Sequence, residues 1–393
     1  MKAFRAGTIL ALACALPVLG ASVATAAPAP AAAQVLFSRD TGGYECFRIP
    51  ALIQAADNSL LAFAEARKPL AGGSWCADAA PIDTVVRRST DHGKTWGAAS
   101  VVLSGSPDGS TAGATRGNPE PILVTRGKHR GRIVLLTTYN PAGGGVRIPF
   151  AQHSDDNGRT WSTATDLGSQ LKPANSGWFA TGPAHGIQLR HGAHAGRLLA
   201  GVNYDDSNGL THGAIAHSDD GGDSWQLGAD ALAPDQNHQF GELSVVEAND
   251  GTVTAIARNK VDGDMTQSRM SAVSTDGGSS FTAAGFTPVP DLGTTPGVQG
   301  ASLLVDRPGR DGTMFFSSPV DSALRKNMTI FASRDAGATW RSVDQVTTDR
   351  SGYSDMTQIG ANELGVLYEA GAYPSGDARD EIRFNLLSLG SLR

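Results

Sequence analysis

The chain of 393 residues repeats one short motif, S-x-D-x-G-x-x-W or a close variant, five times. The copies run over Ser89–Trp96, Ser154–Trp161, Ser218–Trp225, Ser274–Phe281 and Ser333–Trp340. Their starts are separated by 65, 64, 56 and 59 residues. This period fits one blade of four antiparallel strands with its loops, and a fixed period of this kind is typical of propellers and solenoids. The sequence therefore predicts a repeat protein.

Each copy has the composition of a hairpin turn. The Asp can accept hydrogen bonds from nearby backbone N–H groups, and the Gly two positions later can supply the positive φ that such turns need. The closing aromatic residue then anchors the next strand. The copies resemble the Asp boxes of the sialidase (neuraminidase) superfamily, which lie on the outer rim of a propeller. The resemblance implies an all-β, six-bladed β-propeller of four-stranded antiparallel blades.

The N-terminus has the pattern of a secretory signal peptide. Two basic residues precede an apolar run over residues 8–20, and the small residues Ala24-Thr25-Ala26 follow. The run is shorter than the ~20 residues that span a membrane, and Pro17 interrupts it. We therefore predict that residues 1–27 are a cleaved signal peptide and that the protein is secreted.

Residues 34–393 are predicted to form a single catalytic domain. A chain of this length would ordinarily suggest two or more domains, but six units of the observed period account for all of it. The end segments Gln34–Ser38 and Ile382–Leu389 are expected to pair and close the ring, which removes open sheet edges. The formal charge of −6 indicates neither nucleic-acid nor membrane-surface binding, and we expect a monomer.

One arginine occurs in an apolar segment, Phe47-Arg48-Ile49-Pro50. A buried Arg needs an acidic partner or an anionic ligand. The segment resembles the F/Y-R-I-P motif that opens sialidase catalytic domains, whose Arg is the first of three that bind the substrate carboxylate. Arg258 and Arg325 fit the family's other two positions. The resemblance thus assigns carboxylate binding to three arginines, and guanidinium groups can bind a carboxylate bidentately.

Tyr353, in Gly352-Tyr353-Ser354-Asp355, resembles the family's nucleophile. Glu242 resembles the Glu that removes the phenol proton, with Glu247 as the alternative. The anomeric carbon of sialic acid carries a carboxylate, which would repel a carboxylate nucleophile, whereas a phenol is neutral until its proton leaves. Sialidases with a Tyr nucleophile are an established exception among glycosidases.

The loop before Ile82 carries the remaining predicted catalytic residue. Asp78 resembles the family's general acid/base, which protonates the leaving oxygen and later activates water; Asp83 is the alternative. Two cysteines remain after cleavage, and an even number in an oxidising compartment favours a disulfide. We predict a Cys46–Cys76 bond that stiffens this loop, with two free thiols as the alternative.

Further residues have supporting roles by resemblance. Glu369 resembles the acid that holds Arg48 in place, and Arg67 resembles an additional Arg near the carboxylate or the acid/base loop. His185 is expected to be structural. Aromatic side chains that could line a sugar pocket or pack between blades are Trp75, Trp178 and Phe179. No metal-ligand spacing appears, so no metal site and no cofactor are implied.

The resemblance covers residues 34–393 and implies a secreted exo-α-sialidase that hydrolyses terminal α-linked sialic acid with retention of configuration. Its expected partners are sialylated glycans. A trans-sialidase or intramolecular transferase shares these residues and is one alternative. A non-catalytic carbohydrate-binding propeller is the other, and it would lack catalytic residues. The preferred linkage depends on rim loops that the sequence does not define.

Overall fold

A computed structural model describes residues 33–105, 113–141, 147–174, 176–235, 237–259, 267–295, 297–307 and 310–392, together with Met1 and Ala3. Nearly all of the predicted signal peptide, residues 1–27, lies outside the described residues. The chain divides into a unit over residues 1–31 and a unit over residues 32–393, and the fold below is that of the second. Within the described ranges, no helix is long and apolar enough to cross a membrane.

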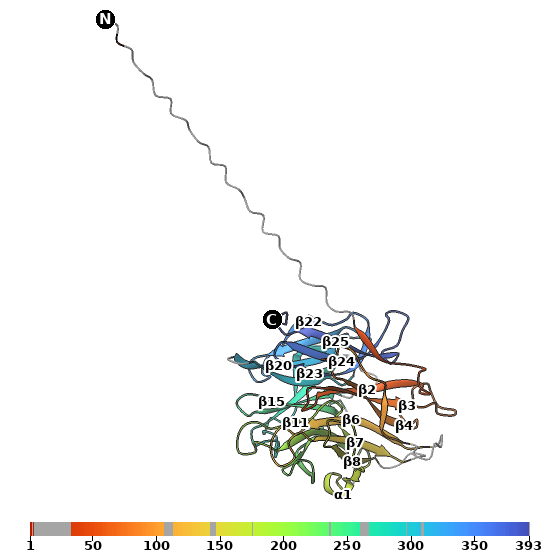
Figure 1. The fold of residues 1–393 in the computed structure, drawn as a ribbon. Coiled ribbons are helices and arrows are strands. Elements are labelled where there is room, and N and C mark those ends of the chain that lie inside the picture. The colour runs from red at the N-terminus through yellow and green to blue at the C-terminus, as the bar shows by residue number, and fades with distance from the viewer. Residues whose placement is uncertain are drawn as a thin grey trace. The chain divides into compact units, whose positions relative to one another are not determined.

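Antiparallel sheets make up almost all of this unit (Figure 1). One sheet consists of β15 (Phe240–Glu247), β16 (Val253–Asn259), β17 (Gln267–Ser274) and β18 (Thr287–Thr295). The next consists of β19 (Ala301–Arg307), β20 (Arg310–Pro319), β21 (Met328–Ser333) and β22 (Arg341–Gln345). A third is ordered β1 (Gln34–Ser38), β25 (Glu381–Ser388), β24 (Glu363–Gly371) and β23 (Arg350–Ile359).

The fourth sheet is ordered β10 (Phe179–Thr181), β12 (Leu198–Asp205), β13 (Thr211–Ser218) and β14 (Gln226–Leu232), with β11 (Ile187–Gln188) also paired to β12. The largest sheet contains β2 (Cys46–Gln54), β3 (Leu60–Arg67), β4 (Ile82–Ser89), β5 (Ser100–Leu103), β6 (Thr115–Leu123), β7 (Ile133–Asn140), β8 (Ile148–Ser154) and β9 (Thr165–Asp166). One short helix, α1 (Gly168–Leu171), follows β9.

The largest sheet holds two repeat units. β4 and β6 are joined by one parallel pair, Ile82 with Thr115. Divided there, the sheets of the described residues become six units of four antiparallel strands, with β10 and β11 as two pieces of one inner strand. This arrangement fits the predicted six-bladed propeller.

The last unit is completed by both ends of the chain. β1 pairs antiparallel with β25, and Figure 1 shows the red first strand beside the blue C-terminal strands. The predicted closure of the ring is therefore confirmed. It also explains why five Asp boxes serve six units: each box lies in the hairpin between the third and fourth strands, and in the closing unit these strands are not consecutive in the chain.

The Asp boxes form tight turns whose aromatic residues pack between neighbouring units, as the second box shows. In the second box, Asp156 accepts hydrogen bonds from the backbone N–H of Thr160 at 2.8 Å and from its hydroxyl at 2.6 Å. Gly158 has φ 79°. The Trp161 ring packs edge-on against Phe63 of β3 in the preceding unit, with centroids 5.9 Å apart. The motif is thus part of the packing between units.

Candidate active site

Four inner strands bulge, and three of these bulges lie beside the predicted site residues Arg48, Glu242 and Tyr353. Their register shifts between Arg48 and Ala51, Gly117 and Glu120, Gly241 and Leu243, and Ser351 and Ser354. Ile49, Asn118 and Glu242 have φ of 54°, 53° and 45°. A β-bulge bends its strand and re-aims a side chain, and bulges are frequent beside active sites. Side chains of these strands are thereby turned toward one cavity.

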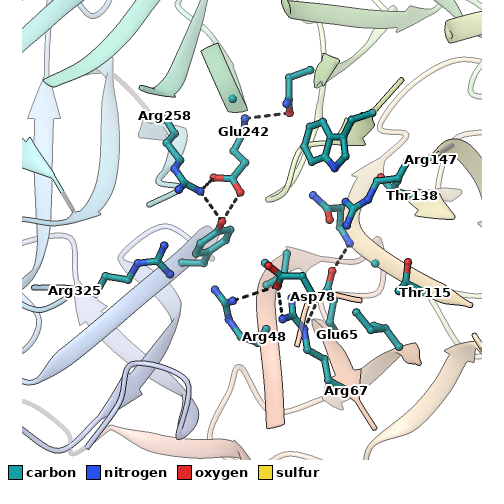
Figure 2. A pocket seen from close by; sticks show the side chains of 18 residues that line it. Arg48, Glu65, Arg67, Asp78, Thr115, Thr138, Arg147, Glu242, Arg258 and Arg325 are labelled. Carbon is teal, nitrogen blue, oxygen red and sulfur yellow. Dashed lines mark hydrogen bonds and ion pairs between the residues drawn. The ribbon is translucent and has the colours of Figure 1, made fainter. Parts of the chain in front are cut away.

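A cavity of about 350 Å³ brings together all seven residues predicted for catalysis and substrate binding. They are Arg48, Arg67, Asp78, Glu242, Arg258, Arg325 and Tyr353. Figure 2 shows the guanidinium groups of Arg48, Arg258 and Arg325 pointing into the same space. The arginines come from three different units, so the fold joins residues that are far apart in sequence.

Tyr353, Glu242 and Arg258 form the centre of the site. The Tyr353 hydroxyl donates a hydrogen bond to Glu242 Oε1. Arg258 Nη1 donates to Glu242 Oε2 at 2.8 Å and to the Tyr353 oxygen at 3.1 Å. The guanidinium carbons of Arg48 and Arg325 lie 5.0 Å and 5.7 Å from the centre of the Tyr353 ring. The phenol therefore contacts a carboxylate and is surrounded by cations.

The protonation states at this centre follow from burial and charge. Burial raises the pKa of Tyr353, and Glu242 raises it further, while the arginines oppose both effects. Burial alone would raise the pKa of Glu242, but the charge of Arg258 and the hydrogen bonds from Arg258 and Tyr353 hold it below its ordinary value. At neutral pH the site thus holds a neutral phenol beside an ionised carboxylate that can accept its proton.

Glu369 holds both the first arginine and the strand of the tyrosine. Its fully buried carboxylate accepts hydrogen bonds from Arg48 Nε at 2.8 Å and Arg48 Nη2 at 3.2 Å. It also accepts from the backbone N–H groups of Ile49 at 2.9 Å and Tyr353 at 3.1 Å. A Cβ added at Gly352 would lie 2.2 Å from Glu369 Oε2, so only glycine fits before the tyrosine.

Arg67 connects the inner end of β3 to the loop of Asp78. Its Nη2 donates to Glu65 Oε2 at 2.6 Å, and its Nη1 donates to Asp78 Oδ1 at 2.5 Å and to the carbonyl of Cys76 at 2.9 Å. The Asp78 side chain is 77% exposed. The atoms of the cavity wall shield this carboxyl in part from water, which would raise its pKa, but the charges of Arg67 and Arg48 outweigh that effect and hold the pKa below its usual range. Asp78 is therefore ionised in the unliganded site.

Cys46 and Cys76 are joined by a disulfide, with Cα atoms 5.7 Å apart. The bond links the start of β2, two residues before Arg48, to the loop two residues before Asp78. The backbone N–H of Cys76 also donates to Glu45 Oε2 at 2.7 Å. The loop is thus anchored on the strand that carries the first arginine.

The two alternative carboxylates lie elsewhere. Asp83 is buried and accepts hydrogen bonds from the Tyr44 hydroxyl at 2.8 Å and the backbone N–H of Gly105 at 2.9 Å. Glu247 accepts from the backbone N–H groups of Arg190 at 2.7 Å and His191. Neither lines the cavity, and both hold backbone in place.

The three aromatic candidates have different surroundings, and only one of them lines the cavity. Trp178 lines the cavity, with its ring centre 5.1 Å from the Arg147 guanidinium carbon. Phe179 is fully buried in an apolar cluster, and Trp75 packs against two arginines outside the cavity lining. His185 is buried, with Nδ1 2.7 Å from Asp355, which agrees with a structural role.

Arg147 lines the cavity although the sequence did not identify it. Burial lowers the pKa of its guanidinium, while the charges of Glu65 and Asp78 oppose that effect. A signal did exist, because Arg147-Ile148-Pro149 repeats the tripeptide of Arg48-Ile49-Pro50. Glu65, which pairs with Arg67, was missed as well. Among the described residues, no group of three or more His, Cys, Asp or Glu side chains is placed to hold a metal ion.

The four-stranded units define a propeller, and the cavity at their inner strands is lined by five arginines. A family model described as a BNR repeat-like domain matches residues 58–366. A sialidase of Micromonospora viridifaciens is 30% identical over 386 residues, which is 90% of this chain and 56% of the relative. A sialidase of Bacteroides fragilis is 25% identical over 349 residues, which is 82% of this chain and 60% of the relative. The chain thus spans a little over half the length of these relatives.

Solved structures share the fold. The intramolecular trans-sialidase of Ruminococcus gnavus, in complex with oseltamivir carboxylate, matches with a TM-score of 0.75 at 19% identity, over 93% of this chain and 99% of that one. The sialidase of Trypanosoma rangeli matches with a TM-score of 0.71 at 19% identity, over 93% and 60%. The chain belongs to the BNR repeat-like family of the sialidase superfamily, and its fold is a β-propeller.

Proposed function

We propose that this protein is an exo-α-sialidase that hydrolyses terminal α-linked sialic acid from glycoconjugates with retention of configuration. The observation that carries the proposal is the contact of the Tyr353 hydroxyl with Glu242, beside three arginines in one cavity. A neutral nucleophile next to a base and a cationic clamp suit a sugar whose reacting carbon carries a carboxylate.

The charges of the site support binding of one carboxylate. Five arginines line the cavity, namely Arg48, Arg67, Arg147, Arg258 and Arg325. Four carboxylates contact them or lie in the lining, namely Glu65, Asp78, Glu242 and Glu369. Among the described residues, Arg325 has no carboxylate partner and donates only to the carbonyl of Gly297, at 3.2 Å. One substrate carboxylate would balance the remaining positive charge.

In the proposed reaction the Tyr353 oxygen forms a bond to the anomeric carbon as the glycosidic bond breaks. Glu242 accepts the phenol proton, and Asp78 gives a proton to the departing oxygen. A water molecule then loses its proton to Asp78 and attacks the anomeric carbon, and Tyr353 leaves and recovers its proton from Glu242. Two displacements at one carbon retain its configuration.

Substrate binding must first change the state of Asp78, because an ionised carboxylate cannot donate a proton. In the unliganded site this carboxylate contacts Arg67 and lies 3.9 Å from Arg48 Nη1. A substrate carboxylate on the arginines would reduce their effect on Asp78, and a sugar over the loop would replace water around it. Both changes raise the pKa of a carboxyl group.

The test is release of the fluorophore from 4-methylumbelliferyl α-N-acetylneuraminic acid by the wild type and by Tyr353→Phe. We expect the variant to lose about a thousandfold or more in kcat, because it keeps the ring and removes only the nucleophilic oxygen. Tyr368→Phe is the matched control, since its hydroxyl bonds to Asn385 at 3.1 Å outside the cavity.

Product analysis separates hydrolysis from the alternatives. Free sialic acid that first appears as the α-anomer supports a retaining hydrolase. An anhydro sugar, or sialyllactose formed when lactose is added, would replace this proposal by an intramolecular transferase or a trans-sialidase. Absence of turnover by a folded wild type would instead support the binding propeller.

We also propose that the protein is secreted after removal of residues 1–27. The support is the order of basic, apolar and small residues at the N-terminus. N-terminal sequencing of protein collected from the culture medium tests this, and an intact N-terminus or retention in the cell would contradict it.

A further inference from the structure

A second cavity adjoins the candidate active site and is assigned to no step of the proposed reaction. Its volume is about 460 Å³, and it shares Arg48 and Arg325 with the first cavity. We call it the side pocket and define it by its charged wall residues, Arg48, Arg325, Arg350, Asp377 and Arg379. Four cations and one carboxylate thus surround one opening.

The side pocket carries more positive charge than its acidic residues balance. Arg48 is paired with Glu369 at 2.8 Å, and Arg379 Nε is paired with Asp377 at 2.7 Å. Among the residues that the structure describes, no carboxylate pairs with Arg325 or Arg350. The proposed substrate carboxylate accounts for Arg325, so the charge of Arg350 is left over.

Arg350 has unused hydrogen-bonding capacity and a defined position. Its Nε is buried and has no hydrogen-bond partner among the described atoms, and its guanidinium carbon lies 5.6 Å from the ring centre of Tyr373. The next residue, Ser351, donates its backbone N–H to the carbonyl of Arg325 at 2.9 Å. The strand that carries Tyr353 thereby holds Arg350 next to the carboxylate clamp.

The opposite wall is also ordered, and the rim is small. The guanidinium carbon of Arg379 lies 4.7 Å from the ring centre of Trp75, and Asp377 receives two hydrogen bonds from that guanidinium, at 2.7 Å and 3.1 Å. The rim residue Ala323 is exposed and has a small side chain. A ligand bound at the clamp can therefore extend over this rim.

We propose that the side pocket is a subsite for an anionic group on the sugar next to the terminal sialic acid. That group is a carboxylate when the neighbour is a second sialic acid in an α2,8-linked pair, or a sulfate when the neighbour is a sulfated sugar. The inference rests on the proposed sialidase function and adds a substrate class to it. Both groups accept charge-assisted hydrogen bonds from guanidinium.

The experiment compares the wild type, Arg350→Gln and Arg341→Gln on three substrates. These are 3′-sialyllactose, α2,8-disialyllactose, and 3′-sialyllactose sulfated on galactose, with kcat and KM obtained from released sialic acid. Arg341 is an exposed residue of β22 outside both cavities, so its variant removes the same charge elsewhere.

We expect Arg350→Gln to lower kcat/KM about fivefold, mainly through KM, for the substrate with the matching second anion, as an exposed ion pair would. Its effect on 3′-sialyllactose should stay below about twofold, and Arg341→Gln should match the wild type on all three. The substrate that responds identifies carboxylate or sulfate as the ligand. An equal loss on all three substrates, or no loss on any, overturns the proposal.

A second pair of variants tests the same subsite even if Arg350→Gln does not fold. Ala323→Glu places a negative charge at the exposed rim, and Ala323→Gln places a neutral side chain of the same size there. The Glu variant should discriminate against the doubly anionic substrate relative to the Gln variant, and equal selectivity would count against the subsite. If no substrate is cleaved, the proposed function fails, and calorimetric binding of α2,8-disialyllactose to the wild type and Arg350→Gln decides the side pocket separately.

Discussion

Replacing Glu369 by Gln removes one charge from the most enclosed part of the site. The carboxylate accepts four hydrogen bonds, two from Arg48 and one each from the backbone N–H groups of Ile49 and Tyr353. A Gln side chain has one acceptor oxygen, so it can accept from only one of two donor pairs, Arg48 Nε with the Ile49 N–H or Arg48 Nη2 with the Tyr353 N–H. In either orientation its NH2 group faces the other two donors.

The expected cost follows from this loss. Removing one partner of a buried ion pair leaves the other charge unbalanced and costs about 3–5 kcal/mol. We therefore expect Glu369→Gln to lower the free energy of unfolding by about that amount. Activity should fall as well, because Arg48 loses its fixed position and the strand of Tyr353 loses a contact. If displacement of Arg48 weakens binding of the transition state by 1.4 kcal/mol, kcat/KM already falls about tenfold.

Urea unfolding and kcat/KM on the fluorogenic substrate measure the two effects. The matched control is Glu381→Gln on the neighbouring strand, where a partly exposed carboxylate pairs with Arg383 at 2.7 Å. That change should cost less than about 1 kcal/mol and leave kcat/KM unaltered. If Glu369→Gln unfolds and turns over as the control does, Arg48 does not depend on Glu369 and the reasoning is wrong.

Three other changes test the parts around this centre. Replacing Cys46 and Cys76 by serine opens a 30-residue loop. In the chain-entropy model this should lower the free energy of unfolding by about 3–4 kcal/mol, so the urea transition should move to a lower urea concentration; an unchanged transition would contradict this. Arg67→Met removes the main positive charge that lowers the pKa of Asp78, so this pKa should rise. The alkaline limb of kcat against pH, which reports the enzyme–substrate complex, should then move to higher pH; a limb that stays in place would exclude Asp78 as the titrating acid. Gly117→Ala would bring a Cβ to 2.2 Å from Glu65 Oε1. This overpacking should lower the free energy of unfolding by about 1–3 kcal/mol, measured by urea unfolding. A transition at the wild-type urea concentration would show that Glu65 can move aside.

The period of the Asp boxes was sufficient to predict the architecture and the closing strand pair, because each box marks the same hairpin in each unit. The cluster of Arg48, Arg258, Arg325 and Tyr353 was also predictable, since a propeller brings its inner strands together. The bulges were not, because positive φ at a residue such as Ile49 depends on contacts with the neighbouring unit and leaves no local pattern.

Arg147 shows the other limit of the sequence. It follows a glycine-rich segment in which a single charge is ordinarily a solvated loop residue. Its place in the cavity depends on how the inner ends of several units converge, which a local pattern does not encode. The repeated tripeptide was a signal, but without the fold nothing related its second occurrence to the site.

One face of β3 contacts both an Asp box at the rim and a bulge beside the cavity. Side chains two residues apart on a strand share a face, so Phe63, Glu65 and Arg67 lie on the same face of β3. The outer part of that face packs against Trp161 of the next box. The inner part carries Glu65, which accepts the backbone N–H of Asn118 in the bulge of that next unit at 2.8 Å.

Glu369 repeats this arrangement one unit earlier. It lies on the second strand of the closing unit and accepts the N–H of Ile49, the bulged residue of the following unit, as Glu65 does with Asn118. In both places a buried carboxylate joins an arginine to the bulge of the next unit. Two of the five arginines that line the cavity, Arg48 and Arg67, are therefore held by the same kind of interface between units. At the rim, each of these two interfaces is packed by the Trp of an Asp box, Trp96 against Phe384 and Trp161 against Phe63.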